Sequence, residues 1–178
     1  MLIILIGNVG SGKTTLAKNS AKHFGWEYFD VDAIKKKLFP KFKDYSKFTA
    51  LGLPMPPNVK LQLYREIAEQ FTNIGRNRVP VIMDETFHTK LGRTAFLNQA
   101  KKHFKKVYVI EIRVHNTIAK NRLSKIRNGH ILQNPWKTRQ AIAKETQPII
   151  NPDLTINNNT SLQKAQKQLN TYLKTLIA

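Results

Sequence analysis

The chain has 178 residues, of which 41% are hydrophobic, and this size and composition predict one globular domain with a full core. It carries 30 Lys+Arg against 11 Asp+Glu, a formal net charge of +19, and it has no cysteine, which excludes disulfides and thiolate metal sites. No apolar run reaches the roughly 18 residues that a membrane-spanning helix needs, so we expect no membrane partner.

The first predicted elements frame a glycine-rich loop. Residues 2–6 are a continuous apolar run typical of a buried parallel strand, and helical periodicity runs from near Lys13 to a stop at Gly25. The loop between them matches G-x-x-x-x-G-K-[ST], whose backbone N–H groups cradle phosphates. Lys13 is then expected to reach the β- and γ-phosphates, and the Thr14 hydroxyl to ligate Mg²⁺. The predicted nucleotide-binding residues are Gly7, Asn8, Val9, Gly10, Ser11, Gly12, Lys13, Thr14 and Thr15.

The remaining strands and helices alternate along the chain. Further strands are predicted at 26–30, 79–84, 107–112 and, more weakly, 153–156. Helices are predicted at 33–39, 63–74, 91–103, 118–126 and 138–145, and a last one follows a capping box at Thr160. The segments 40–58 and 127–137 are predicted to be a loop-rich excursion and a mobile connector. This alternation predicts an α/β fold with a parallel sheet covered on both faces.

Three aspartates lie where predicted strands end, which is where such sheets bind ligands. Asp84 ends an apolar strand, as in the Walker B pattern, and is expected to hold Mg²⁺. Asp32 is favoured as the base that takes the proton of an acceptor hydroxyl. Asp30 is interpreted either as a helix N-cap or as a residue that holds a metal-bound water, and which of Asp30 and Asp32 is the base stays open.

Basic residues after these strands are candidates for contacts with phosphate. Arg122 and Arg127 are expected to close over the transferring phosphoryl group from a lid at 127–137, although a solvated basic face is the rival interpretation. Arg93 is a weaker candidate for substrate contact. His88 has no visible partner and is left out of the catalytic set.

Glu85 keeps a second class of function open. An apolar strand that ends in Asp-Glu also occurs in ATPases, where the glutamate polarises the attacking water. That interpretation predicts a nucleotide-hydrolysing switch or binding protein. The short chain lacks room for the transmission elements of such machines, so this remains the minor alternative.

The motifs at residues 7–14, 30–32, 81–87 and 121–127 occur in an order that resembles P-loop kinases of the AAA-domain type. These are similar to the kinase part of phage polynucleotide kinase, and gluconate kinase, shikimate kinase, chloramphenicol phosphotransferase and zeta toxins belong to the same broad group. The resemblance covers essentially the whole chain. It implies a three-layer P-loop NTPase fold with a five-stranded parallel sheet in the order 2-3-1-4-5, a lid, and one kinase domain over residues 1–178.

The resemblance also assigns roles to residues. It implies that Asp32 is the general base, that Arg122 or Arg127 contacts the phosphates, and that Thr86 lies near the acceptor. Residues 40–58 occupy the place where these kinases diverge most, so the resemblance does not identify the acceptor.

Together these features predict an ATP- and Mg²⁺-dependent kinase that phosphorylates a hydroxyl, with a small-molecule acceptor favoured. The net charge of +19 favours an alternative, a 5′-hydroxyl polynucleotide kinase, because a basic surface attracts nucleic acid. The preference for ATP over GTP and the oligomeric state stay open. Because the sequence shows no secretory signal pattern, we expect a cytoplasmic protein.

Overall fold

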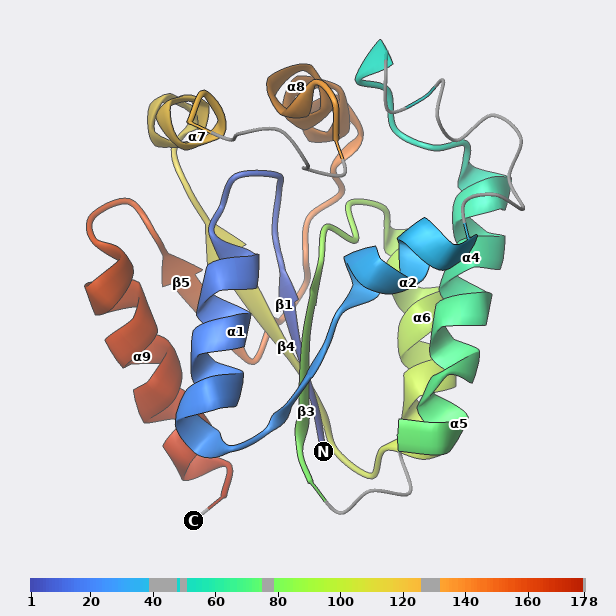
Figure 1. Ribbon diagram of the computed structural model, residues 1–178, viewed down its shortest axis with the longest axis vertical. Coiled ribbons are helices and arrows are strands. Elements are labelled where there is room, and N and C mark those ends of the chain that lie inside the picture. The colour runs from blue at the N-terminus through green and yellow to red at the C-terminus, as the bar shows by residue number, and fades with distance from the viewer. Residues whose placement is uncertain (39–47, 49–50, 75–78, 126–131, 178) are drawn as a thin grey trace.

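A parallel β-sheet forms the centre of the protein (Figure 1). The computed structural model describes residues 1–38, 48, 51–74, 79–125 and 132–177. Within these residues the strands lie in the order β2-β3-β1-β4-β5, all parallel. Their bounds are β1 Leu2–Ile6, β2 Glu27–Phe29, β3 Val81–Glu85, β4 Val107–Arg113 and β5 Leu154–Asn157. The predicted fold class and strand order are confirmed.

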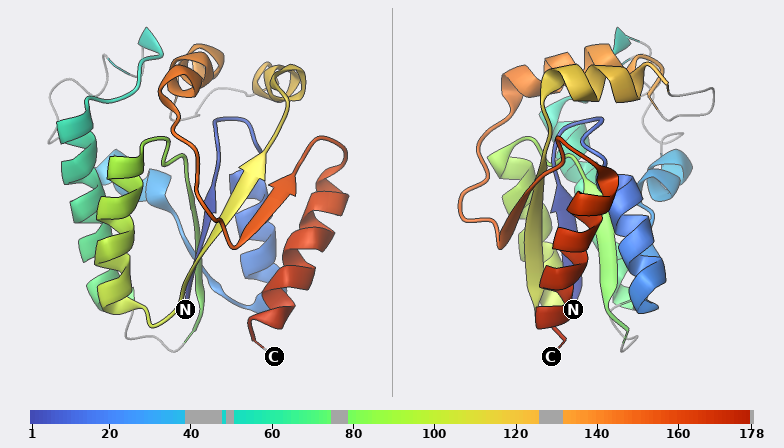
Figure 2. Two further views of the ribbon diagram at one scale, coloured as in Figure 1. Left: turned by 180° about the vertical axis from the view of Figure 1, so that it is seen from behind. Right: turned by 90° about the vertical axis from the view of Figure 1, so that its left-hand side faces the viewer.

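Helices cover both faces of the sheet, which gives three layers (Figures 1 and 2). Side chains of Ile3 and Leu5 pack in the cluster with α1 and α9, while Leu2, Ile4 and Ile6 pack on the opposite side with α4, α5 and α6. This burial on both faces explains why β1 is apolar throughout instead of alternating. The helix bounds are α1 Lys13–Phe24, α2 Val31–Leu38, α4 Pro57–Glu69, α5 Phe71–Ile74, α6 Lys90–His103, α7 Asn116–Leu123, α8 Pro135–Glu145 and α9 Leu162–Thr175.

Helices α7 and α8 lie across the end of the sheet at which the phosphate-binding loop follows β1 (Figure 2). A small buried cluster of Val9, Leu123 and Ile142 joins this loop to the two helices. None of the helices described combines the length and the apolar character needed to cross a membrane.

Several predicted boundaries are wrong by a few residues. The connector expected at 127–137 already becomes helical at Pro135, because Asn134 caps α8 and proline is well suited to the first helical position. Residues 127–131 of the predicted lid lie outside the described residues. The cap of α9 is Ser161, whose hydroxyl accepts a hydrogen bond from Lys164 N at 3.2 Å, and not Thr160.

Helix α2 begins at Val31, two residues before the predicted start. The Asp30 carboxylate accepts a hydrogen bond from Ala33 N at 2.9 Å, which is the N-cap arrangement that was one of two interpretations of this residue. Asp32 therefore lies in the first turn of α2, at the carboxyl edge of the sheet.

Candidate active site

The loop between β1 and α1 is shaped to receive an anion. Gly10 and Gly12 have φ angles of +78° and +91°, in the left-handed region that favours glycine. A Cβ on Gly12 would also lie 2.5 Å from Asn158 Nδ2. Gly12 is the N-cap of α1 and has no side chain with which to cap the helix. The N–H groups at the start of α1 therefore remain available to a phosphate.

Lys13 and Thr14 lie at the end of this loop, in the first turn of α1. The buried Lys13 side chain folds back across the loop, and its Nζ donates to the Asn8 carbonyl at 3.1 Å. Burial lowers the pKa of Lys13, while Asp84 and Glu85 oppose this effect. The lysine is thus positioned beside the loop amides, where it can bind phosphate oxygens.

The structure also brings the two predicted magnesium ligands together. The Thr14 hydroxyl donates to Asp84 Oδ2 at 2.9 Å, and the Tyr28 hydroxyl donates to Asp84 Oδ1 at 2.7 Å. Burial raises the pKa of Asp84, and Lys13, Tyr28 and Thr14 oppose that rise. A hydroxyl and a carboxylate are the hard oxygen donors that Mg²⁺ prefers, so this pair fits the ion.

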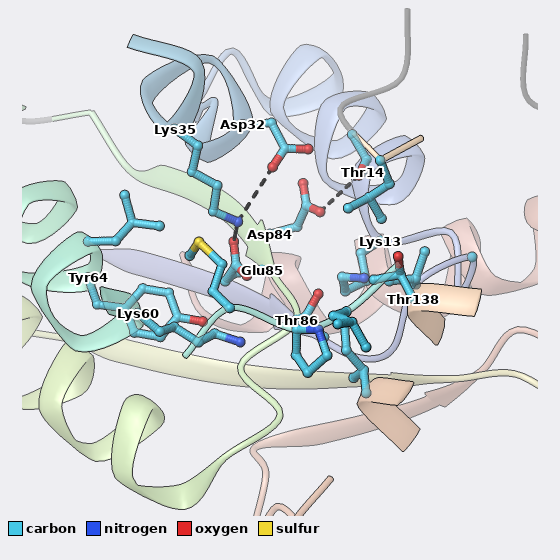
Figure 3. A pocket seen from close by; sticks show the side chains of 18 residues that line it. Lys13, Thr14, Asp32, Lys35, Lys60, Tyr64, Asp84, Glu85, Thr86 and Thr138 are labelled. Atoms are coloured by element: carbon cyan, nitrogen blue, oxygen red, sulfur yellow. Dashed lines mark hydrogen bonds and ion pairs between the residues drawn. The ribbon is translucent and has the colours of Figure 1, made fainter. Parts of the chain in front are cut away.

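A cavity of about 160 Å³ opens beside these residues, between the phosphate-binding loop, α2, α4, α8 and the end of β3 (Figure 3). Asp32 and Thr86, both predicted to face the acceptor, line it together with Lys13 and Thr14. Its charged lining residues are Lys13, Asp32, Lys35, Lys60, Asp84 and Glu85.

Two carboxylates in this cavity differ in their surroundings. The Lys35 ammonium binds the buried Glu85 carboxylate directly and lies 3.6 Å from Asp32 Oδ1. Burial alone would raise the pKa of Glu85, but Lys35 and Lys60 outweigh it and hold this pKa below its ordinary value. Asp32 has a side chain 53% exposed and opens to the cavity. The ionised Glu85 carboxylate is a weak base because Lys35 and Lys60 stabilise its negative charge. The geometry therefore favours Asp32 for proton transfer.

A chain of polar contacts leads from Lys60 in the cavity to His88 and Glu145. Lys60 Nζ lies 2.8 Å from His88 Nδ1 and, because an ammonium only donates, this nitrogen accepts the bond. The His88 proton is then on Nε2, which faces Glu145 Oε2 at 3.4 Å. Burial and the Lys60 charge lower the pKa of His88 to about 4, and burial lowers the pKa of Lys60 to about 8. His88 thus has partners that its sequence neighbourhood did not indicate.

Arg122 is not among the residues that line the cavity. Arg122 donates to the carbonyl oxygens of Asn158 at 3.0 Å and Ser11 at 3.4 Å, so it holds the back of the phosphate-binding loop. Arg127 lies outside the described residues. Asp30, besides its capping bond, lies 3.7 Å from Lys18 Nζ.

Arg93 is buried and holds backbone together. Its guanidinium donates to carbonyl oxygens after β3, on Phe87 and His88, and before β5, on Gln147 and Pro148. Phe87 has a φ of +42°, which is unusual for a residue other than glycine, so Arg93 supports a strained turn next to the site. This arrangement gives Arg93 a structural role and does not bring it to the cavity lining.

Arg139 is a residue of the site that sequence reasoning missed. It is 4% exposed, and its guanidinium donates to the carbonyls of Val9 and Val114 and to Asn116 Oδ1. It therefore fastens α8 to the phosphate-binding loop. Asn158 adds a second brace, because its Nδ2 donates to the Ser11 carbonyl at 2.8 Å. Neither residue belongs to a motif that could have identified it.

Comparisons with known proteins agree with the fold. A family model described as an AAA domain matches residues 2–144. A sugar kinase from Janibacter sp. HTCC2649 is 20% identical with a TM-score of 0.74, over 97% of this chain and 94% of that one. A gluconokinase from Sinorhizobium meliloti 1021 is 16% identical with a TM-score of 0.66, over 98% and 95%. An APS kinase from Mycobacterium tuberculosis, solved with AMPPNP and APS, is 13% identical with a TM-score of 0.67, over 97% and 96%. No curated protein sequence matches the chain significantly.

Proposed function

The chain belongs to the AAA-domain family whose model it matches, and we propose that it is an ATP-dependent kinase that phosphorylates a hydroxyl of a small molecule. One observation carries this proposal. The phosphate-binding residue Lys13, the Thr14–Asp84 pair and the separate carboxylate Asp32 all line one cavity. The first three serve the phosphate donor, and the fourth serves an acceptor on the other side of the transferred group.

The residues divide the reaction between them. The loop amides and Lys13 bind the β- and γ-phosphates, and Thr14 and Asp84 would hold Mg²⁺, which when bound neutralises phosphate charge. Asp32 takes the proton of the acceptor hydroxyl as its oxygen forms a bond to the γ-phosphorus. The bond from that phosphorus to the β-phosphate oxygen breaks, and ADP leaves with the electron pair. Most of the rate then comes from positioning and charge, as in other phosphoryl transfers.

The basic residues outside the cavity have supporting roles in this proposal. Arg122 braces the loop from behind. Contact of Arg122 or Arg127 with the transferring phosphoryl group stays a prediction. A metal role for Asp30 likewise stays a prediction, since its carboxylate caps α2. The bonds of Arg93 to backbone leave it no evident part in substrate binding.

The acceptor is proposed to be small. The names of the sugar kinase and the gluconokinase describe small-molecule acceptors, and a cavity of about 160 Å³ suits a molecule of that size. The polynucleotide alternative is supported by the net charge of +19 alone. A 5′-hydroxyl oligonucleotide belongs in the acceptor panel for this reason.

Transfer of label from γ-labelled ATP tests the proposal. The panel contains polyols, sugar acids, nucleosides and the oligonucleotide, each with Mg²⁺. We expect acceptor-dependent transfer that falls about 10²–10⁴-fold in Asp32→Asn, because a general base contributes that much, while ATP binding is kept. Wild-type turnover in Asp32→Asn would remove Asp32 as the base. ATP hydrolysis that needs no acceptor would replace the kinase by the hydrolytic alternative.

A further inference from the structure

We propose that the acceptor carries an anionic group, a carboxylate or a phosphate, and that Lys60 and Tyr64 bind this group. The inference rests on the proposed function, because it names the class of molecule that the same cavity takes. It is carried by two hydrogen-bond donors on α4 to which the proposed phosphoryl transfer gives no role.

Lys60 and Tyr64 stand one turn apart on α4 and enter the cavity together (Figure 3). Residues four apart share one face of a helix, and Lys60 Nζ lies 5.8 Å from the centre of the Tyr64 ring. The two side chains therefore lie side by side on the wall of the cavity that α4 provides.

The Tyr64 hydroxyl lies near the Glu85 carboxylate but forms no hydrogen bond of normal geometry with it. Tyr64 is 1% exposed, and its hydroxyl has no hydrogen-bond partner among the residues that the structure describes. Burial and the nearby Glu85 carboxylate raise the pKa of Tyr64, so the hydroxyl keeps its proton. Buried polar groups of proteins are nearly always paired, and a ligand oxygen in the cavity would supply the missing acceptor.

The Lys60 ammonium also has donors to spare. His88, a neutral imidazole, takes one of its three N–H groups, and within the described chain no carboxylate lies within 4.0 Å of Lys60 Nζ. The charged groups that act on it are Glu85 and Glu145, which favour its charge, and Lys35, which opposes it. Glu85 is bound by Lys35, so an anion in the cavity would provide the close counter-charge that Lys60 lacks.

The position of these donors suits a two-ended acceptor. Lys13 and Thr14 come from α1 and Asp32 from α2, whereas Lys60 and Tyr64 come from α4 (Figure 3). An acceptor whose anionic end lies on α4 can turn a hydroxyl toward Asp32 and the transferred phosphate. Its negative charge is then held by a lysine instead of facing the donor phosphates unshielded, which like charges disfavour.

Calorimetric binding to matched ligand pairs tests the proposal, in the presence of AMPPNP and Mg²⁺. One arm compares alditols with the aldonic acids of equal chain length, such as sorbitol with gluconate and ribitol with ribonate. The other arm compares sugars with their phosphates, such as glucose with glucose 6-phosphate, and so separates the two sources of negative charge. We expect at least one anionic member to bind about tenfold or more tightly than its neutral partner, as hydrogen bonds to charged groups allow.

Variants locate the effect. Lys60→Met is expected to weaken binding of the anionic ligand about ten- to a hundredfold, and Tyr64→Phe by less, while both keep the wild-type affinity for AMPPNP. Lys101→Met, on the exposed side of α6, is the matched control and keeps wild-type binding. In isotope-labelled wild-type protein, the lysine resonance that titrates near pH 8 is expected to move to higher pH when the anion binds.

The outcomes separate this proposal from the kinase assignment. Neutral ligands that bind as tightly as their anionic partners, a panel in which no anion binds, or full anion affinity in Lys60→Met would each overturn the anion site. Binding of an anion through Lys60 without phosphate transfer from ATP would leave the site standing and remove the kinase. Phosphate transfer to a neutral acceptor at the wild-type rate in Lys60→Met would keep the kinase assignment and remove the anion site.

Discussion

The Tyr28 hydroxyl donates a hydrogen bond to Asp84 at 2.7 Å, and it thereby orients a carboxylate that Thr14 also holds. Tyr28 lies on β2, the strand next to β3, so the sheet itself places the phenol beside the Thr14–Asp84 pair. The ring of Tyr28 packs against the core, while its hydroxyl reaches the site.

Tyr28→Phe is expected to weaken the proposed binding of Mg²⁺ by Thr14 and Asp84 without unfolding the protein. The phenyl ring keeps the packing, but Asp84 loses the group that fixes its orientation. Loss of a residue that hydrogen-bonds to a metal ligand typically weakens metal affinity or activity about 10–100-fold. Initial rates measured against Mg²⁺ concentration check this, and Tyr108→Phe on β4 is the control. An unchanged Mg²⁺ dependence in Tyr28→Phe would mean that Asp84 needs no such support.

Local patterns explain what the sequence could predict. The parallel sheet follows from the alternation of strands and helices, and its strand order was implied by the resemblance alone. The loop at residues 7–14 is a contiguous motif whose chemistry depends on its own backbone. Asp84 was predicted beside Thr14 because parallel strands end at one edge of a sheet, and the two side chains lie 2.9 Å apart.

Tertiary packing explains what the sequence could not predict. Lys60, Tyr64 and Arg139 reach the site from helices whose rotation depends on the whole core. In a chain with 30 Lys+Arg, an inward-facing basic side chain has no local signature that separates it from a solvated one. Glu145 likewise meets His88 from the last residue of α8, 57 positions further along the chain, so no spacing rule could pair them.

Arg139→Met is expected to lower the unfolding free energy by about 2–5 kcal/mol, because it removes a buried guanidinium and leaves one buried and two part-buried acceptors without their donor. Those acceptors are the Val9 and Val114 carbonyls and the Asn116 amide oxygen. Since Val9 belongs to the phosphate-binding loop, ATP affinity should fall as well.

Arg113→Met provides the matched control for that variant in urea unfolding. Arg113 has a side chain 58% exposed and pairs with the Glu111 carboxylate, whose side chain is 15% exposed. Because solvent reaches the guanidinium, we expect this pair to contribute no more than about 1 kcal/mol. Equal losses of stability in the two variants would contradict the proposed fastening of α8 to the loop.

Lys35→Met is expected to destabilise the protein strongly at neutral pH. It leaves the buried Glu85 carboxylate without its closest counter-charge, and removing one partner of a buried pair costs about 3–5 kcal/mol. Adding Glu85→Gln removes the stranded charge and should restore most of that loss. The comparison needs the unfolding free energies of both single variants and the double variant, and purely additive effects would show that the pair is not coupled.

Acidification should destabilise the protein in part through His88. The folded protein holds the pKa of His88 at about 4, below its ordinary value of 6.5, because of burial and the Lys60 charge. Between pH 6.5 and 4 the unfolded chain takes up a proton that the folded one refuses. The contribution of His88 is therefore complete above pH 6.5 and is lost as the pH falls toward 4, by up to about 1.4 kcal/mol per pH unit.

His88→Gln isolates this contribution, because a glutamine does not titrate. We expect its unfolding free energy to fall less steeply than that of the wild type between pH 6.5 and 4, whatever its stability at pH 7. His23→Gln, at an exposed position of α1, should keep the wild-type slope. Urea unfolding at half-unit pH steps gives the three slopes. Parallel curves for the wild type and His88→Gln would show that His88 takes up its proton equally in the folded and unfolded states. That result would contradict a buried neutral imidazole held between Lys60 and Glu145.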